Sequence, residues 1–188
     1  MDVRAYIQLM NTIEALKCNT RHSWTSSGRR ESVAEHSWRL ALMAYFVKDE
    51  FPEADIDKVI LMCLCHDLGK AFTGDIPAFE KTAADEIAEQ NAIDAFTARL
   101  AEPYGSGLTR LFAEMAEMKT LEARIYKALD KTEAILQHNE ADIATWLPLE
   151  YHESLVYGGD EVAFSKYLSD LKAELNRDSI RKIEAAEK

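Results

Sequence analysis

One stretch of the sequence constrains the fold more than any other. Residues 59–65 form an uninterrupted apolar run, and His66 and Asp67 follow it directly. A helix that is apolar on every side is buried on every side, so these two polar residues should emerge from the interior. A buried imidazole beside a buried carboxylate is costly unless something compensates both. A divalent metal at the end of a core helix is one economical compensation, and Gly69 fits the end of that helix.

The composition favours an all-α protein. The chain has 188 residues, of which 47% are apolar and 29% charged, enough for one domain with a substantial core. Only seven glycines and four prolines interrupt a sequence rich in helix-forming residues. We therefore expect a single helical domain over residues 1–188 without significant β-sheet. Its core should span about 5–150, and a C-terminal helix should cover about 160–188, with a charged end from 176 that frays.

Charge and cysteine content limit the partners and the location of the protein. A formal charge of −11 argues against binding to a nucleic-acid polymer or an anionic membrane. It is compatible with a small phosphorylated ligand, because a bound metal supplies local positive charge. The three cysteines are an odd number, and Cys63 and Cys65 point to different sides of one helix, so we expect reduced thiols. Without a signal peptide or a membrane-spanning run, we expect a cytoplasmic protein.

Helical periodicity predicts the remaining elements. The expected helices lie at about 3–17, 32–49, 79–101, 108–118 and 120–139, with a turn over 103–107. Residues 19–30 break the periodicity and contain Arg21, Arg29 and Arg30, which predicts a loop. A solvated loop accounts for this composition. A phosphate or nucleotide site also accounts for it, because such sites recruit clustered arginines and hydroxyl donors.

A histidine lies on the core face of the helix predicted at 32–49. Ser32 and Glu35 match the capping box, which gives Glu35 a structural role rather than a catalytic one. At 100° per residue, His36 shares a face with Val33 and Leu40. A lone histidine on an apolar face is more often a hydrogen-bonded core residue than a ligand. The second buried histidine, His66 with its adjacent aspartate, shifts the interpretation towards a metal site.

A second aspartate is ambiguous by periodicity. Ile125, Leu129, Thr132, Ile135 and Leu136 form the main apolar stripe of the helix predicted at 120–139. Asp130 lies well off this stripe, so the pattern predicts a surface carboxylate. It would be interior only if this helix were buried on two sides.

Three blocks of sequence together resemble a known family. Residues 31–37 contain His36, residues 65–67 contain His66 and Asp67 with a Thr-Gly-Asp-Ile-Pro loop at 73–77, and residues 127–131 contain Asp130. In this order they resemble the HD-domain metal-dependent phosphohydrolases, in particular the bacterial 5′-deoxynucleotidases and their eukaryotic HD-domain relatives. The resemblance covers about residues 5–150.

The resemblance implies a metal centre and a reaction. One divalent ion would be held by His36, His66, Asp67 and Asp130, and this mixed nitrogen and oxygen set suits Mn, Co, Fe, Ni, Zn or Mg without selecting among them. The family reaction is hydrolysis of a deoxynucleoside 5′-monophosphate to a nucleoside and phosphate. The substrate would be a small phosphorylated molecule, most simply a nucleotide, and the resemblance suggests a homodimer.

Further positions follow from the same resemblance. Arg21 matches an arginine that contacts substrate, and His22 stands where the bacterial enzymes have a tryptophan. Four successive residues match the loop that contacts the sugar, and Asp75 among them can accept a hydrogen bond from a 3′-hydroxyl. The expected substrate-binding residues are Arg21, His22, Asp75, Ile76, Pro77 and Ala78.

One position departs from the deoxynucleotidases, which have a glutamate three residues after the paired aspartate. Lys70 stands there in this chain. A lysine cannot accept a proton at neutral pH without a large pKa shift, but it binds phosphate as a point charge. The expected catalytic residues are Asp67 and Lys70. Either Asp67 or one of Glu35, Glu114 and Glu117 assists the attacking water, or the metal suffices.

Three other functions compete with this hypothesis. The first is an HD phosphohydrolase acting on a dinucleotide, a nucleoside triphosphate or a non-nucleotide phosphoester. The second is a nucleotide-binding regulatory module without turnover. The third is a helical structural domain, in which His66 and Asp67 would need other buried partners.

Overall fold

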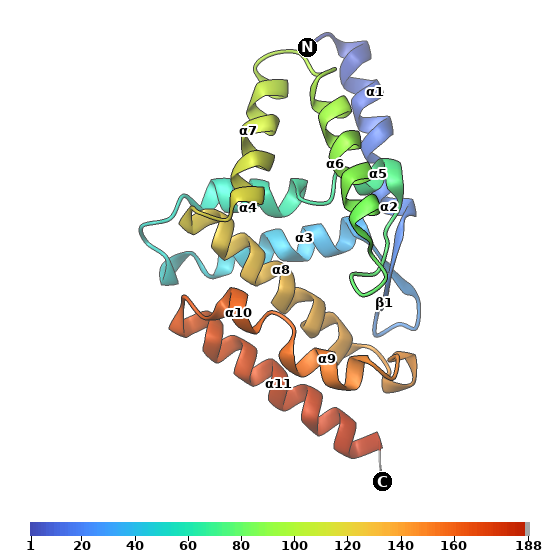
Figure 1. Ribbon diagram of the computed structural model, residues 1–188, viewed down its shortest axis with the longest axis vertical. Coiled ribbons are helices and arrows are strands. Elements are labelled where there is room, and N and C mark those ends of the chain that lie inside the picture. Colours follow the sequence, from blue (N-terminus) through green and yellow to red (C-terminus); the bar gives the residue numbers. More distant parts are fainter. Residues whose placement is uncertain (187–188) are drawn as a thin grey trace.

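The computed structural model of the protein describes residues 1–186 and confirms the predicted all-α class (Figure 1). Two 3₁₀ turns (η) and one short hairpin accompany the helices. In chain order the elements are α1 (Val3–Ile13), α2 (Ala15–Cys18), β1 (Thr20–Trp24), β2 (Arg30–Ser32), α3 (Val33–Phe46), η1 (Lys48–Glu50), α4 (Ile56–Cys65), α5 (Lys70–Thr73), α6 (Ala83–Thr97), α7 (Tyr104–Glu117), α8 (Leu121–Glu140), η2 (Ile143–Thr145), α9 (Glu150–Val156), α10 (Gly159–Val162) and α11 (Lys166–Ala186).

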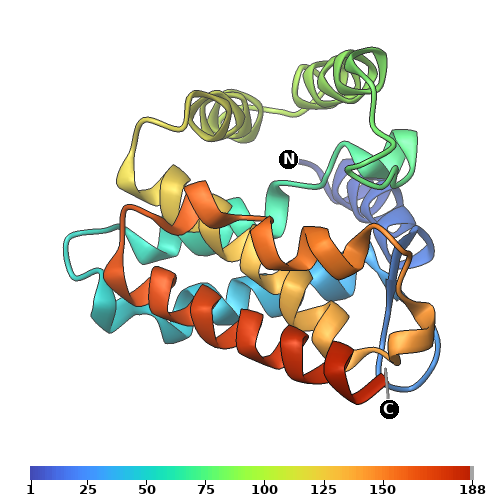
Figure 2. The same ribbon diagram turned by 60° about the horizontal axis from the view of Figure 1, so that its bottom comes forward.

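Helix α8 is the central element of the fold. It packs against α3 and α4 on one side and against α11 on the other, while β1 lies beside its C-terminal half (Figures 1 and 2). The core formed by these helices includes Leu40, Met62 and Leu129, all completely buried. Because α8 is covered on two sides, polar residues off its main apolar stripe can still lie inside the protein.

Helices α6 and α7 form a pair that stands beside this central group, as Figure 2 shows most clearly. Gly105 at the start of α7 permits their close approach. A Cβ atom at this position would lie 2.7 Å from the carbonyl oxygen of Thr97 and 2.9 Å from that of Leu100. These distances leave no room for a side chain, so glycine is required by packing here.

Helix starts follow the capping chemistry expected from the sequence. The capping box of α3 is confirmed: the Ser32 hydroxyl accepts from the Glu35 backbone N–H, and the Glu35 carboxylate accepts from that of Ser32. Asp55 caps α4 by accepting from the backbone of Lys58. These caps fix where α3 and α4 begin, and so set the positions of the histidines that they carry.

The predicted loop over 19–30 was wrong in part. Residues Thr20–Trp24 and Arg30–Ser32 pair as an antiparallel hairpin, β1 and β2, with an irregular register. The strands are too short and polar to show an alternating pattern in the sequence. The hairpin matters for function because it holds Arg21 and His22 against α8 rather than in solvent.

Other sequence predictions need correction. Helix α4 is not buried on every side, since Leu61 and Leu64 are exposed. The predicted turn over 103–107 is largely the first turn of α7, and the last helix begins at Lys166 after the short α10 rather than at 160. The charged end does not fray from 176, because α11 continues to Ala186; residues 187–188 lie outside the described chain.

Two expectations from the sequence concerned membrane-spanning segments and disulfide bonds. Among the helices of residues 1–186, none has the length and apolar character that crossing a bilayer requires. All three cysteines are unpaired, and Cys63 is buried in the core next to α8.

Candidate metal centre and substrate cavity

Three helical segments bring four candidate ligands together. His36 comes from the second turn of α3, His66 and Asp67 from the end of α4, and Asp130 from the middle of α8. His66 Nε2 lies 3.2 Å from Asp67 Oδ2 and 3.7 Å from Asp130 Oδ1, and His36 Nε2 lies 3.2 Å from the same Asp130 oxygen. Donor atoms of His36, His66 and Asp67 all lie within 4.8 Å of one another.

Both histidines direct the same ring nitrogen towards this point. The Nδ1 atom of His66 lies 2.9 Å from the backbone carbonyl oxygen of Cys63, and the Nδ1 atom of His36 contacts the carboxylate of Glu133. Carbonyl and carboxylate oxygens accept hydrogen bonds, so each Nδ1 carries a proton and each Nε2 is the ring nitrogen that faces the other candidate ligands. A second group that fixes the tautomer in this way is typical of histidines that bind metals.

The two aspartates are held in the ionised form. Burial alone would raise the pKa of Asp67, but the charges of His66 and Lys70 hold it well below its ordinary value. Burial alone would likewise raise the pKa of Asp130, but Lys127 and His36 hold it well below its ordinary value. Lys70 Nζ lies 2.9 Å from Asp67 Oδ2, and Lys127 Nζ lies 2.9 Å from Asp130 Oδ2.

This donor set fits a single divalent ion. Two imidazole Nε2 atoms that face inwards and two ionised carboxylates supply ligands of the kind that first-row transition metals take. Four protein ligands also leave positions for small molecules in a six-coordinate ion. The geometry is therefore compatible with the metal centre that the sequence predicts, and it does not choose the metal.

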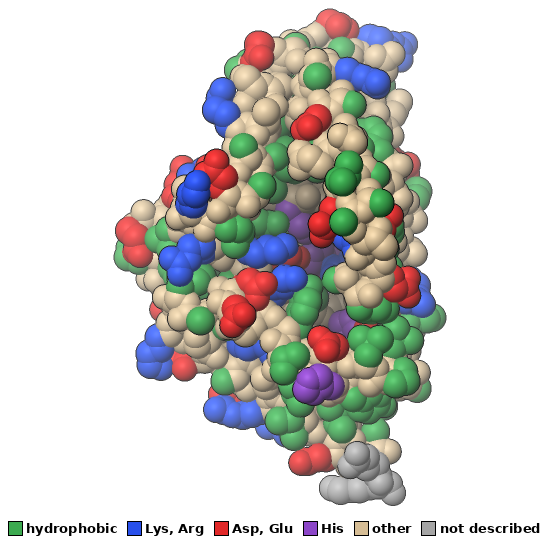
Figure 3. Space-filling view, in the orientation of Figure 1, with side chains coloured by type: hydrophobic (Ala, Val, Ile, Leu, Met, Phe, Trp, Pro, Cys, Tyr) green, Lys and Arg blue, Asp and Glu red, His purple; other side chains and the backbone are tan. Residues whose placement is uncertain are grey.

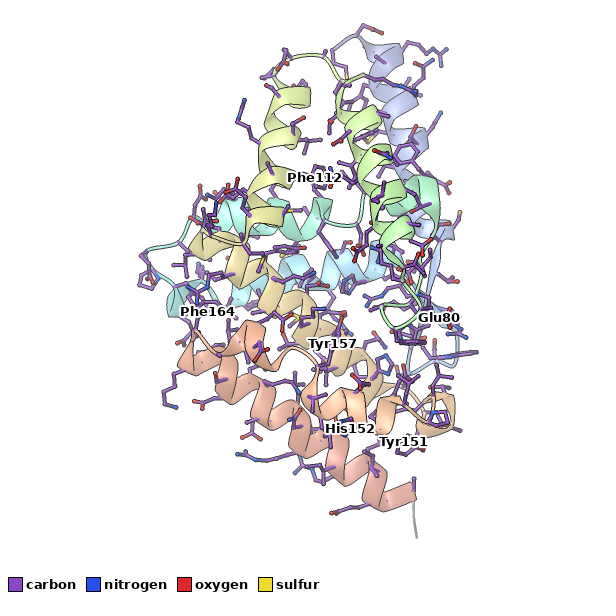
Figure 4. All side chains as sticks on the ribbon, in the orientation of Figure 1. Glu80, Phe112, Tyr151, His152, Tyr157 and Phe164 are labelled. Carbon is purple, nitrogen blue, oxygen red and sulfur yellow. The ribbon has the colours of Figure 1, made fainter. Side chains whose placement is uncertain are left out.

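The four residues lie in the wall of a cavity of about 940 Å³. The face in Figure 3 is hollowed at its centre, where histidine, lysine and arginine side chains are visible. Figure 4 shows Phe112 from α7 above this hollow and Tyr157, between α9 and α10, below it; both line the cavity. The volume is in the range of small-molecule binding sites.

Asp130 lies inside because the face of α8 off the main apolar stripe is the face that lines the cavity. Cavity-lining residues recur along this helix at helical spacing: Lys127, Asp130, Lys131, Ala134 and His138. The Asp130 side chain is only 15% exposed. Periodicity alone predicted a surface carboxylate, and this was wrong because α8 is enclosed on two sides.

Glu133 is a functional residue that the sequence interpretation missed. It is completely buried, contacts His36 Nδ1, and accepts from Arg39 Nε at 2.7 Å. Burial would raise its pKa, but His36 and the neighbouring arginines lower it to about 2. The available signal was its spacing, three residues after Asp130 on the same helix.

The predicted substrate residues surround the same cavity. Arg21 reaches across from β1, with its guanidinium 3.5 Å from both Glu31 and Glu133. His22, Ile76, Pro77 and Ala78 also line the cavity. His22 does so with its ring edge-on to Phe79, at 5.3 Å between centroids.

Lys70 links the metal centre to the loop after α5. Its Nζ lies 2.6 Å from Asp75 Oδ1 and 2.9 Å from Asp67 Oδ2. Burial would lower the pKa of Lys70, but these two carboxylates raise it above the ordinary value. Lys70 therefore carries a positive charge at neutral pH and cannot act as a base.

The alternative water-assisting carboxylates lie elsewhere. Glu35 is committed to its cap and to Arg29, whose NH1 atom lies 2.9 Å away. Glu114 pairs with Lys58 at 2.9 Å, and Glu117 pairs with Lys119 on the surface. None of the three lines the cavity. Of the carboxylates named from the sequence for this role, only Asp67 is in place.

Comparison with known proteins identifies the class of protein. Residues 13–172, well over half of the chain, match the family described as HD domain. The chain therefore belongs to the HD-domain family, which confirms the resemblance seen in its three sequence blocks.

Particular relatives carry more specific names. The protein called 5′-deoxynucleotidase HDDC2 from Dictyostelium discoideum is 33% identical over 145 residues, 72% of this chain and 76% of its own. Its human namesake is 28% identical over 178 residues, 91% of this chain and 86% of its own. A crystal structure described as a predicted metal-dependent phosphohydrolase from Magnetospirillum magnetotacticum superimposes with a TM-score of 0.81 at 26% identity, covering 96% of this chain and 93% of that one.

Proposed function

We propose that this protein is a metal-dependent phosphomonoesterase that hydrolyses (deoxy)nucleoside 5′-monophosphates to nucleoside and phosphate. One observation carries the proposal: two histidines and two ionised aspartates converge in the wall of a nucleotide-sized cavity, with Lys70 and Lys127 each paired with one of these aspartates. The similarity to proteins named 5′-deoxynucleotidase supports the choice of substrate class.

The ligands of the ion are His36, His66, Asp67 and Asp130. When bound, a divalent ion lowers the pKa of a coordinated water and neutralises charge on a phosphoryl group. Asp67 is both a ligand and the partner of Lys70 at 2.9 Å, so its carboxylate is the group placed to orient the attacking water. Glu133 positions His36 by holding its Nδ1 proton.

Cationic side chains explain how an acidic protein accepts a phosphate. Lys70, Lys127, Lys131 and Arg21 line the cavity. Lys70 and Lys127 each pair with one ligand aspartate, so both ammonium groups lie next to the position of a reacting phosphoryl group. Such groups are point charges for phosphate oxygens, while Arg21 can offer a planar pair of donors.

The rest of the substrate extends towards the loop after α5. Asp75 can accept a hydrogen bond from a sugar hydroxyl, and Lys70 holds its carboxylate in place at 2.6 Å. Ile76, Pro77 and Ala78 form an apolar wall beside it, and the ring of His22 packs edge-on against Phe79, the next residue. Arg21, through its contacts with Glu31 and Glu133, couples this wall to the buried network behind His36.

The test is phosphate release from a panel of phosphoesters. Chelator-stripped protein reloaded with Mn, Co, Mg or Zn is assayed on the four deoxynucleoside monophosphates, their ribose counterparts, a dinucleotide, a nucleoside triphosphate and p-nitrophenyl phosphate. We expect turnover of the monophosphates that Asp67→Ala abolishes. Turnover of another phosphoester alone assigns a different substrate. Nucleotide binding without turnover under any metal refutes the enzyme and leaves a regulatory module.

We also propose a homodimer. Helices α3 and α4 pack together, and each exposes large apolar side chains: Trp38 is 61% exposed, Phe46 76% and Leu61 46%. Exposed apolar groups on adjoining helices are typical of protein interfaces. Light scattering should give a dimer that Phe46→Glu converts to a monomer, whereas Ile87→Glu, at an exposed position of α6, should not.

The free thiols support a reducing location, the cytoplasm.

A further inference from the structure

A second cluster of potential ligands lies in the same cavity, away from the four residues already described. It consists of His22 from β1, His138 from the last turn of α8 and Glu150 from the start of α9. These elements are brought together only by the fold, and all three side chains line the cavity. Their donor atoms lie within 4.8 Å of one another.

The donor atoms converge on one carboxylate oxygen. His22 Nε2 lies 2.8 Å from Glu150 Oε1, and His138 Nε2 lies 3.5 Å from the same oxygen. The other oxygen of Glu150 accepts from the backbone N–H of Leu147 at 2.6 Å, which fixes the orientation of the carboxylate. The two histidine rings are 5.2 Å apart between centroids, as close as those of His36 and His66 at 5.3 Å.

The protonation states also suit a ligand set. Burial, together with the charges of His22 and Arg21, lowers the pKa of His138 to about 4, although Glu150 opposes this shift. His138 is therefore neutral at physiological pH, the form that binds a metal.

This cluster is separate from the first ligand set. In the described residues, the ion pairs of His22, His138 and Glu150 run among themselves, and none reaches His36, His66, Asp67 or Asp130. Ser23 lies 3.3 Å from His138 Nε2 and is the other polar side chain bonded to the group. The two sets therefore form two distinct centres in one cavity.

We propose that His22, His138 and Glu150 form a second divalent-metal site, which opens onto the cavity of the first. Two imidazoles and one carboxylate are a known ligand set for zinc and for other first-row transition ions, and they leave coordination positions free. The three side chains line the cavity, so an ion held there could take a donor atom from a molecule bound in it. This site is additional to the proposed function and does not depend on it.

The experiment counts ions by site. Full-length protein is stripped with chelator and dialysed against excess Zn²⁺, and bound zinc is measured by mass spectrometry with protein concentration in parallel. We expect two zinc ions per chain in the wild type, one in Glu150→Gln and one in Asp67→Ala. Glu153→Gln is the matched control, since Glu153 lines the cavity on the same helix but lies outside the cluster; it should retain two.

Circular dichroism shows whether each variant is folded. This control is needed because the Glu150 carboxylate also accepts a hydrogen bond from the backbone N–H of Leu147. His22→Ala, at a position whose side chain is 25% exposed, provides a second loss-of-site variant that should also bind one ion. One ion in the wild type, retained in Glu150→Gln and His22→Ala and lost in Asp67→Ala, would overturn the second site. A failure of the first site has a different signature, in which the single remaining ion survives Asp67→Ala and disappears in Glu150→Gln.

Discussion

Glu133→Gln tests the role of the buried carboxylate behind the metal centre. The wild-type carboxylate accepts the Nδ1 proton of His36 and so directs the Nε2 lone pair to the ion. A glutamine has the same shape, but its NH₂ group can donate to Nδ1, which places the proton on Nε2. Loss of a carboxylate that holds the outer nitrogen of a ligating histidine lowers metal affinity by about ten- to a hundredfold. This corresponds to about 1.4–2.7 kcal/mol of binding free energy.

The same substitution weakens the pairing of Arg39, whose Nε lies 2.7 Å from Glu133. Loss of a charged hydrogen bond costs about 1.5–3 kcal/mol. For a chain of this size that lowers Tm by roughly 3–12 °C. Metal affinity is measured by competition with a chelator of known affinity, and Tm is measured on the metal-free protein, so that the two effects are separated.

Glu140→Gln is the matched control. Glu140 is on the same helix and pairs with NH1 of the same arginine at 2.5 Å, but it is 45% exposed and does not contact His36. We expect its metal affinity to equal that of the wild type. An unchanged affinity in Glu133→Gln, or an equal loss in both variants, would refute the tautomer argument.

Three further predictions concern packing, pH and phosphate binding. Gly105→Ala inserts a Cβ against backbone oxygens and should lower the free energy of unfolding by about 1–3 kcal/mol. Gly107→Ala, at a position where a Cβ would meet nothing within 4 Å, should not lower it. Urea unfolding measures both. Burial lowers the pKa of His138 from 6.5 to about 4. Between these pH values His138 takes up a proton in the unfolded chain but not in the folded one, so the free energy of unfolding falls on acidification. This fall should be smaller in His138→Gln than in the wild type, with both measured in the presence of chelator. Lys70→Gln should raise KM for the phosphoester about tenfold or more, and an unchanged KM would exclude phosphate binding by Lys70.

The fold class and the interior positions of His36 and His66 were predictable from local sequence. The apolar run before His66 and the capping box before His36 are patterns within one element, and each sets a helix whose core side is readable. The prediction that α4 is buried on every side was wrong, because Leu61 and Leu64 are exposed, as are large apolar side chains of α3. A purely apolar run cannot distinguish a core contact from a subunit contact, since both favour the same residues.

The rest of the site depends on contacts between distant elements. Asp130, Glu133 and His138 lie on faces of α8 that periodicity assigns to solvent, and only the enclosure of α8 by other elements makes them interior. Arg21 reaches the site because β1, a short strand without an alternating pattern, packs against α8. Apart from the spacing of Glu133 from Asp130, such positions carry no signal in a single sequence beyond their residue type.

The most direct test of the metal centre is anomalous X-ray scattering from a crystal soaked in Mn²⁺, with data on both sides of the manganese absorption edge. We predict an anomalous peak within about 2.3 Å of His36 Nε2, His66 Nε2 and one oxygen each of Asp67 and Asp130, at distances typical of manganese and other first-row ions. A peak that excludes His36 or Asp130, or a well-ordered site with no peak at saturating Mn²⁺, would contradict the four-ligand centre on which the proposed hydrolysis depends.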